Sequence, residues 1–326
     1  MLRDEVLSLL KGGTELSGEA MSRTLGVSRA AVWKAIEALR QEGYVIASAP
    51  RRGYRLEASP DRLSAGELSA PGRRVGREVV CLGTVDSTNN EIKRRAVDAV
   101  PDGLAVLAEE QTGGRGRRGR SFLSPAGKGL YLSVLLKPDC TLEQVSALTA
   151  WTAVAVCDGV EALCGVRPCI KWPNDVILDG RKLCGILTEL ELEAETAALR
   201  YVVVGLGLNV SQTGADFGPE VAPVAVSLAQ ALGTAPRRAD AAAAILDALD
   251  RMYADFPARW ETWLDRYRAD CLTLGRTVKL LRAGGAEEAF AEAVDGNFAL
   301  VVRHPDGRRE AVSSGEVSVR GLLGYL

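Results

Sequence analysis

The stretch Gln111-Thr112-Gly113-Gly114-Arg115-Gly116-Arg117-Arg118-Gly119-Arg120 organises this chain, and it follows an apolar, strand-like run at residues 104–108. Glycine permits positive φ and close ligand approach, and arginine offers a planar fork of donors to phosphate or carboxylate. The stretch is not a P-loop, because no Gly-Lys-Ser/Thr ends it. A nucleic-acid tail or a linker would share this composition, but such tails usually lie at a terminus. The sequence therefore favours a substrate-binding loop.

Composition limits the remaining possibilities. The 326 residues are 47% hydrophobic with a net charge of −2, which predicts two or three soluble domains and only local basic surfaces. We recognise no signal peptide and no apolar run of membrane-span length, so a cytoplasmic location without membrane contact is expected. The seven cysteines form no Cys-x-x-Cys pair and His304 is the only histidine. These counts argue against a zinc site, a disulfide framework or a Ser-His-Asp triad.

Residues 1–60 predict a winged helix-turn-helix. Helices are expected at 2–11, after Ser17 and at 29–41, with a glycine turn at Gly26 between the last two. Two short strands then flank a basic tip, which is typical of a wing. A small helical domain for protein contacts would be the alternative. The candidate DNA-binding residues are Ser28, Arg29, Trp33, Lys34, Arg51 and Arg52.

A Pro/Gly/Ser-rich connection follows, and then a strand at 78–82 leads to Asp86-Ser87-Thr88-Asn89-Asn90-Glu91 at a helix start. Thr88 and Glu91 have the spacing of a capping box, which is one interpretation of the group. The other is that the hydroxyls and the amide hold a polar ligand. This motif alone does not decide between them.

A second polar motif, Lys171-Trp172-Pro173-Asn174-Asp175, is expected at a strand end, because Pro173 interrupts a regular ladder. Asp179-Gly180 predicts a two-residue hairpin turn, after which Lys182 begins a strand of apolar and small residues. A lysine there meets an anion or reaches water at a sheet edge. A long buried helix is expected at 143–164, a buried strand at 201–210, helices at 240–268 and an all-β region from Cys271 onward.

Taken together and in this order, these motifs closely resemble the bacterial bifunctional biotin protein ligase and biotin operon repressor. The resemblance covers essentially the whole chain. It implies an α+β multidomain protein, in which residues 1–60 form the winged helix-turn-helix and residues 61–75 a linker. A central mixed α/β catalytic domain of the biotin/lipoate ligase type follows in 76–270, and a small SH3-like β-barrel in 271–326.

The resemblance also implies an activity. ATP and Mg²⁺ activate biotin as biotinyl-5′-adenylate, and biotin then passes to a lysine of the biotin carboxyl carrier protein of acetyl-CoA carboxylase. The implied catalytic residues are Lys182, Arg115 and Arg117. Biotin would contact Ser87, Thr88, Asn89, Gln111, Gly114, Arg115, Gly116, Arg117, Lys182, Gly185 and Gly205. ATP or the adenylate would contact Arg117, Arg118, Arg120, Phe122, Lys171, Asn174 and Asn209, and Mg²⁺ would use Asn174 and Asp175.

One position departs from the family, since Phe122 stands where the well-known relative has tryptophan; this keeps an apolar lid and loses an indole donor. Operator DNA and a homodimer of the adenylate-bound protein are the further implied partners. Two alternatives stay open. One is a lipoate-type ligase on the same scaffold, and the other is a ligand-sensing repressor without ligase activity.

Overall fold

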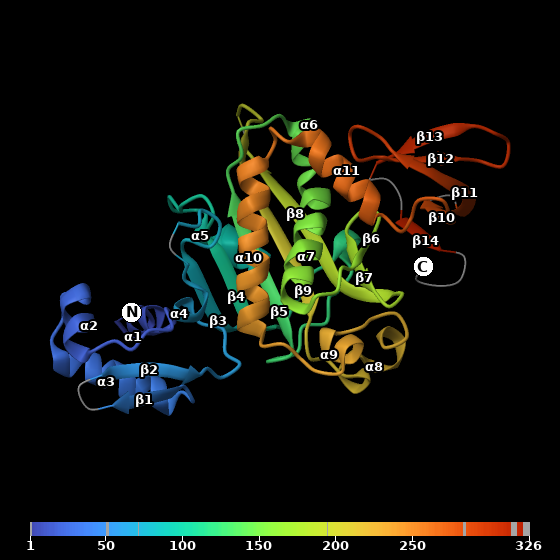
Figure 1. Ribbon diagram of the computed structural model, residues 1–326. Coiled ribbons are helices and arrows are strands. Elements are labelled where there is room, and N and C mark those ends of the chain that lie inside the picture. The colour runs from blue at the N-terminus through green and yellow to red at the C-terminus, as the bar shows by residue number, and fades with distance from the viewer. Residues whose placement is uncertain are drawn as a thin grey trace.

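The computed structural model describes residues 2–49, 52–70, 72–193, 195–282, 285–313 and 318–321. Over these ranges the chain forms a two-stranded, then a seven-stranded and then a five-stranded sheet. Figure 1 shows the small N-terminal part on one side of the large central sheet and the last sheet on the other. The order of the three sheets along the chain agrees with the predicted sequence of a winged helix, an α/β core and a β-rich end.

The N-terminal part has its own apolar core. Ser17 and Ser28 accept hydrogen bonds from Ala20 N and Ala31 N and so cap the second and third helices. Apolar residues of all three helices, among them Val6, Met21 and Ile36, are buried together. The elements are α1 (Leu2–Leu10), α2 (Gly18–Leu25), α3 (Arg29–Gln41), β1 (Val45–Ala49) and β2 (Gly53–Ala58).

A short helix, α4 (Ala65–Leu68), joins this part to the central sheet. Its Glu67 is only 1% exposed and lies 3.5 Å from Lys11 Nζ of the segment after α1 and 3.2 Å from Arg237 Nη2. The buried Arg238 nearby pairs with Asp61. Because a buried charge is costly without a partner, these pairs fix the path of the chain between the two parts.

The central sheet has the order β3-β4-β5-β9-β8-β7-β6, in which β3 and β4 are parallel and every other neighbouring pair is antiparallel. The predicted turn is confirmed, because Asp179 and Gly180 both have positive φ between β7 and β8. The strands are β3 (Val79–Val85), β4 (Ala105–Gln111), β5 (Gly129–Leu136), β6 (Cys169–Lys171), β7 (Asp175–Leu178), β8 (Arg181–Leu192) and β9 (Leu199–Asn209).

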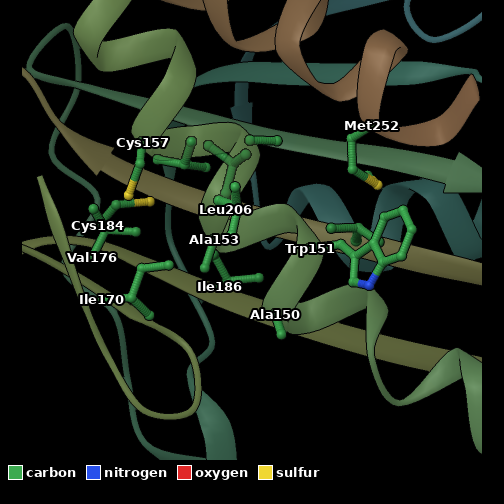
Figure 2. Packing of buried hydrophobic residues seen from close by; sticks show 14 of the residues in the cluster. Ala150, Trp151, Ala153, Cys157, Ile170, Val176, Cys184, Ile186, Leu206 and Met252 are labelled. Atoms are coloured by element: carbon green, nitrogen blue, oxygen red, sulfur yellow. The ribbon is translucent and has the colours of Figure 1, made fainter. Parts of the chain in front are cut away.

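Both faces of this sheet are covered. Alternate residues of one strand join different cores: Val202 and Val204 belong to the large cluster, while Val203 packs with Ile92 of α5 (Thr88–Arg95). The large cluster lies under α7 (Leu148–Cys164) and α10 (Arg238–Asp255). Figure 2 shows Met252 of α10 beside Trp151 of α7. Both belong to the large cluster, whereas Ile92 of α5 belongs to a separate one.

The expected helix at 143–164 is broken, since α6 (Leu142–Val145) ends before α7 begins. Contrary to the sequence expectation, residues 142–164 are long and apolar enough for a membrane span. However, 67% of the most apolar 18-residue stretch of this segment is buried inside the protein. Its apolar character is therefore that of a core helix.

The remaining helices are α8 (Gly214–Val221), α9 (Leu228–Leu232) and α11 (Trp260–Asp270). The last sheet, β10 (Thr277–Arg282), β11 (Gly285–Val294), β12 (Leu300–Arg303), β13 (Arg309–Val312) and β14 (Ser318–Gly321), is antiparallel in the order β13-β12-β11-β10-β14. Within the described ranges β13 and β14 stand at opposite edges, so the closed SH3-like barrel stays a prediction. Residues 283–284, 314–317 and 322–326 of this predicted all-β region lie outside the described residues.

Candidate active site

A recess partly open to solvent lies between the Gly-Arg loop, the start of α5 and residues of β8 and β9. Segments far apart in the chain therefore converge on one place. The residues that line it are Ser87, Thr88, Asn89, Gln111, Arg115, Gly116, Arg117, Phe122, Asn174, Lys182, Gly185, Ile186, Leu187, Gly205, Leu206 and Gly207.

The Ser-Thr-Asn group stands at the start of α5, but not as a capping box. Ser87 occupies the N-cap position and makes no side-chain capping hydrogen bond. Glu91 bonds instead to Arg94 and Arg95 on its own helix. Ser87, Thr88 and Asn89 are each at most 4% exposed and line the recess. The capping interpretation of Thr88 and Glu91 was wrong, and the ligand interpretation is favoured.

Gln111, the last residue of β4, is locked in one orientation. Its Oε1 accepts from the backbone N and the hydroxyl of Thr88, at 2.9 and 3.1 Å. Its Nε2 donates to Ser124 Oγ at 2.9 Å. Thr88 Oγ1 also lies 2.7 Å from Ser133 Oγ, a fully buried hydroxyl on β5. One wall of the recess is thus a fixed set of neutral polar groups, suited to an uncharged polar ligand.

Lys182 meets an anion, as one interpretation of the sequence required. Its Nζ lies 2.6 Å from Asp175 Oδ1, and both side chains are largely buried. The register between β7 and β8 shifts at this point, because Val176 faces Cys184 while Ile177 faces Lys182. Such a bulge turns a side chain to the other face of a strand. The Lys182 ammonium lies 3.0 Å from where a Cβ of Gly185 would stand, so a larger residue at 185 would push the lysine from this position by a few tenths of an ångström.

Arg117 reaches the same place from the loop. Its Nη1 donates to Asn174 Oδ1 at 3.0 Å, and the Asn174 amide nitrogen donates to Ile186 O on β8 at 2.9 Å. Burial lowers the pKa of Arg117, an effect that Asp175 opposes. The guanidinium stays charged at neutral pH in any case. A partly desolvated cation therefore stands beside Lys182.

Arg115 lies at the outer rim, with its side chain 49% exposed. Its Nη1 donates to Asn90 Oδ1 at 3.2 Å and lies 3.6 Å from Glu189. An ion pair as exposed as this contributes little to stability. Arg115 can therefore exchange its partner for a ligand anion at small cost.

Three glycines make space for neighbouring side chains. A methyl group on Gly205 would lie 2.0 Å from Asn89 Oδ1, and one on Gly207 would lie 2.4 Å from the ring of Phe122. A methyl group on Gly114 would lie 2.3 Å from the Phe122 carbonyl oxygen. The Phe122 ring lies over Gly207, as an apolar lid would, and makes a T-shaped contact with the Tyr131 ring.

Four predicted nucleotide-binding residues lie outside the recess lining. Arg118 and Arg120 are exposed on the loop, and Arg118 has positive φ. Lys171 is buried at the end of β6, in register with Asp175. Asn209 is buried, and its amide nitrogen donates to Lys182 O and Val226 O. Asn209 thus holds the backbone at Lys182, and its contact with a nucleotide stays a prediction.

The described residues contain no group of three or more His, Cys, Asp or Glu side chains suited to a metal ion. Asp175 is the one carboxylate among the predicted metal ligands, and the Asn174 oxygen accepts from Arg117. Mg²⁺ in nucleotide sites commonly uses one or two carboxylates and takes its other ligands from phosphates and water. The donors present fit an ion carried in mainly by phosphates.

Comparison with known proteins gives consistent matches. Residues 82–209 match the profile described as "Biotin/lipoate A/B protein ligase family", and residues 3–55 match an "HTH domain". The bifunctional ligase/repressor BirA of Bacillus subtilis is 34% identical over 96% of this chain and 97% of its own. The Escherichia coli protein of the same name is 31% identical over 97% and 96%.

The chain belongs to the bifunctional biotin ligase/repressor family. A solved structure agrees: the biotin protein ligase of Aquifex aeolicus, in complex with biotin and ATP, is 28% identical with a TM-score of 0.64. The match covers 75% of this chain and 99% of that one. The family fold therefore extends beyond the motifs to the whole ligase part.

Three polar residues around the recess of this family member escaped the sequence analysis. Ser133 bridges Thr88 and Asn89, Ser124 holds Gln111, and Glu189 accepts from Asn89. Ser133 interrupts the apolar strand β5, Glu189 lies on β8 beyond the residues singled out from the sequence, and neither belongs to a motif. The sequence feature that could have identified them is a polar side chain on a strand of the buried sheet, because such a side chain is costly to bury without a partner.

The predicted DNA-binding residues that the structure describes are all exposed, on α3 or at the wing. Ser28, Arg29, Trp33 and Lys34 are exposed at the start of α3, and Trp33 is 54% exposed. Arg29 and Trp33 line a second recess together with Ser48, Ala49 and Gly53 of the wing. Arg52 is exposed at the wing tip, while Arg51 lies outside the described residues.

Proposed function

We propose that this protein is an ATP-dependent biotin protein ligase. It activates biotin to biotinyl-5′-adenylate and transfers biotin to a lysine of the biotin carboxyl carrier protein of acetyl-CoA carboxylase. The observation that carries this proposal is the meeting, in one recess, of a buried neutral polar wall with the cations of Lys182 and Arg117.

The neutral wall suits biotin rather than lipoate. Ser87, Thr88, Asn89 and Gln111 offer hydroxyl and amide groups, which match the N–H and C=O groups of an uncharged ureido ring. The dithiolane ring of lipoate has neither group, so it would leave these buried groups without partners. Leaving buried polar groups without partners lowers binding affinity far more than a change in the apolar volume of the ligand does.

The charged wall suits adenylation. Attack of a carboxylate on an α-phosphate brings negative charges together, so cations must face the developing charge. Lys182 and Arg117 already line the recess, and Arg115 can move in from the rim. Asp175 would hold Mg²⁺ together with the phosphates, whose charge the ion neutralises.

The Gly-Arg loop would then keep the reactive anhydride from water until the carrier lysine attacks. The loop is tied at its base, where Gly113 N donates to Asp86 O and Phe122 N donates to Gly114 O. Its tip lies between these ties and carries Arg117. A loop fixed at the base with a glycine-rich tip can close without unfolding the strand that precedes it.

We also propose that the N-terminal part represses biotin genes as a dimer on operator DNA, with the adenylate promoting dimerisation. The exposed start of α3 beside the wing supports this, because such a helix enters the major groove. One small winged helix contacts too little DNA for tight and selective binding, so two half-sites are expected. A cytoplasmic location follows from this pair of roles.

Thermal shift and pyrophosphate release test the ligand. Biotin should raise the melting temperature, and biotin with ATP and Mg²⁺ should release pyrophosphate, whereas lipoate should do neither. Equal responses to lipoate would favour the lipoate-type ligase. Binding of biotin without any pyrophosphate release would favour a ligand-sensing repressor.

A further inference from the structure

Glu189 does not line the recess, yet it holds a residue that does. It lies on β8 with 18% of its side chain exposed. Its Oε2 accepts from Asn89 Nδ2 at 2.8 Å, and its Oε1 accepts from Lys93 Nζ at 2.8 Å. Two short hydrogen bonds to one partly buried carboxylate indicate a fixed orientation.

Glu189 is a carboxylate at neutral pH. Burial favours its neutral form, but hydrogen bonds from Lys93 and Asn89 outweigh burial, and the pKa of Glu189 is lowered overall. An ionised carboxylate can only accept hydrogen bonds. It therefore dictates which end of the Asn89 amide faces it.

The direction of the next hydrogen bonds follows from this. Asn89 turns its nitrogen toward Glu189 and the Leu187 carbonyl, so its Oδ1 faces the buried Ser133 hydroxyl, 2.6 Å away. Ser133 must give its one proton to that oxygen. The Ser133 oxygen, 2.7 Å from Thr88 Oγ1, is then left as an acceptor.

Thr88 now stands between two acceptors, Ser133 Oγ and Gln111 Oε1. The Gln111 oxygen is fixed as an acceptor by the backbone N–H of Thr88. The single proton of the Thr88 hydroxyl stays within this network, whichever acceptor takes it. The hydroxyl therefore presents a lone pair, not a proton, to the recess.

We propose that Glu189 is a positioning residue that determines ligand specificity, because it sets the direction of the hydrogen bonds from Asn89 to Thr88. The recess consequently selects a ligand that offers an N–H to Thr88. This inference rests on the proposed function, in which that donor is a ureido N–H of biotin.

Glu189→Gln is the sharpest single test, since it keeps the size and shape of the side chain and changes only its charge and hydrogen-bonding groups. The Lys93 ammonium will donate its hydrogen bond to the oxygen of the new amide, because charge-assisted hydrogen bonds are stronger than neutral ones. The new NH₂ group then faces the NH₂ group of Asn89, so the Asn89 amide must rotate and the chain of hydrogen bonds reverses. We expect biotin affinity, measured by calorimetry without ATP on the full chain, to fall roughly ten- to hundredfold.

Exchanging the carboxylate and the amide between positions 89 and 189 restores the original direction of the hydrogen bonds. In the double variant Asn89→Asp with Glu189→Gln, the carboxylate at position 89 accepts from both the amide at position 189 and the Ser133 hydroxyl, and the net charge is that of the wild type. We expect the double variant to regain most of the lost affinity. Glu191→Gln, two residues along the same strand, is the matched control and should bind biotin as the wild type does.

Biotin methylated on its ureido nitrogens supplies a second readout, which a merely structural role would not change. The wild type should strongly prefer biotin over the methylated form, and Glu189→Gln should lose much of that preference. The inference is overturned if Glu189→Gln binds biotin within about twofold of wild type with the preference intact, or if the swap rescues nothing. A wild type that binds no biotin would overturn the proposed function itself, and this inference with it.

Discussion

The two recesses of this protein are built in opposite ways. In the ligase recess the polar groups are buried and already bonded to one another, as Thr88, Gln111 and Ser133 show. At the start of α3 the polar and aromatic groups are exposed, and Trp33 is 54% exposed. A ligand of the first recess must match a pattern that the protein has fixed in advance. The second surface completes its contacts only on a DNA partner.

This difference separates what each site can recognise. Preorganised donors and acceptors cost nothing to orient when the ligand arrives, so they discriminate between small chemical differences. Long exposed side chains adapt to phosphates and base edges, and part of the selectivity then resides in the DNA. Changes in the buried recess should therefore have larger effects than changes on the exposed surface.

The largest effect should come from Lys182→Ala. This substitution removes a preorganised cation from a largely buried site, and such losses typically slow the chemical step on the order of 100-fold or more. Pyrophosphate release is the measurement. Lys137→Ala, an exposed lysine whose ammonium bonds to a backbone carbonyl, is the matched control. Near-normal release by Lys182→Ala would refute the role of Lys182.

Arg117→Gly should have the next largest effect. It removes the bond to Asn174 and adds backbone freedom, so the closed loop becomes a minor state. We expect adenylate retention to fall roughly ten- to hundredfold, because hydrogen bonds to charged groups are worth about 1.5–3 kcal/mol. Released adenylate would acylate lysines of an unrelated protein mixed with biotin, ATP and the variant. Arg117→Lys, which keeps the charge without the fork, should label less of that protein.

An Arg117→Gly variant that still labels only the carrier lysine would contradict this account. The loop would then be sealed by other contacts, among which the Phe122 ring over Gly207 is the first to test.

Arg29→Ala should have a smaller effect and should act on DNA alone. Loss of one base or phosphate contact at an exposed site typically costs about 1–3 kcal/mol, or roughly tenfold in operator affinity. Ligase activity should be unchanged, since Arg29 lies on α3, outside the ligase recess. Equal affinity of wild type with adenylate for biotin-gene upstream DNA and for random DNA would contradict the repressor role.

The smallest effect tests the burial of Cys184, which follows Lys182 on β8 and lies in the large apolar cluster. Burial raises the pKa of Cys184 to about 12, against a weaker opposing influence of Lys182, so the thiol stays protonated at pH 8. Iodoacetamide should modify the exposed Cys169 and leave Cys184 intact until the protein unfolds. Mass spectrometry of the peptides will show this. Equal rates at the two cysteines would mean that the strand behind Lys182 is open to solvent.

Much of the local structure was predictable from local signals. The third helix lies at Arg29–Gln41 as expected, because Ser28 caps it, and the Asp179-Gly180 turn has the expected positive φ. Lys182 meets an anion because the cost of burying a lone ammonium demands one.

The missed parts depend on contacts between distant residues. Asn89 and Glu189 are 100 positions apart, and Asn89 and Ser133 are 44 apart. No periodicity links such pairs, so only the pairing of the strands brings them together. The capping interpretation of Thr88 and Glu91 failed for a related reason, since Gln111 at the end of β4 accepts from Thr88 instead.

The most direct test of the central claim is transfer itself. The protein is incubated with biotin, ATP, Mg²⁺ and a biotin carboxyl carrier domain, and the intact mass of the carrier is measured. We predict a gain of one biotinyl group on a single lysine, dependent on ATP and absent when lipoate replaces biotin. An unchanged carrier, or a carrier modified equally well by lipoate, would contradict the assignment of this recess to biotin activation and transfer.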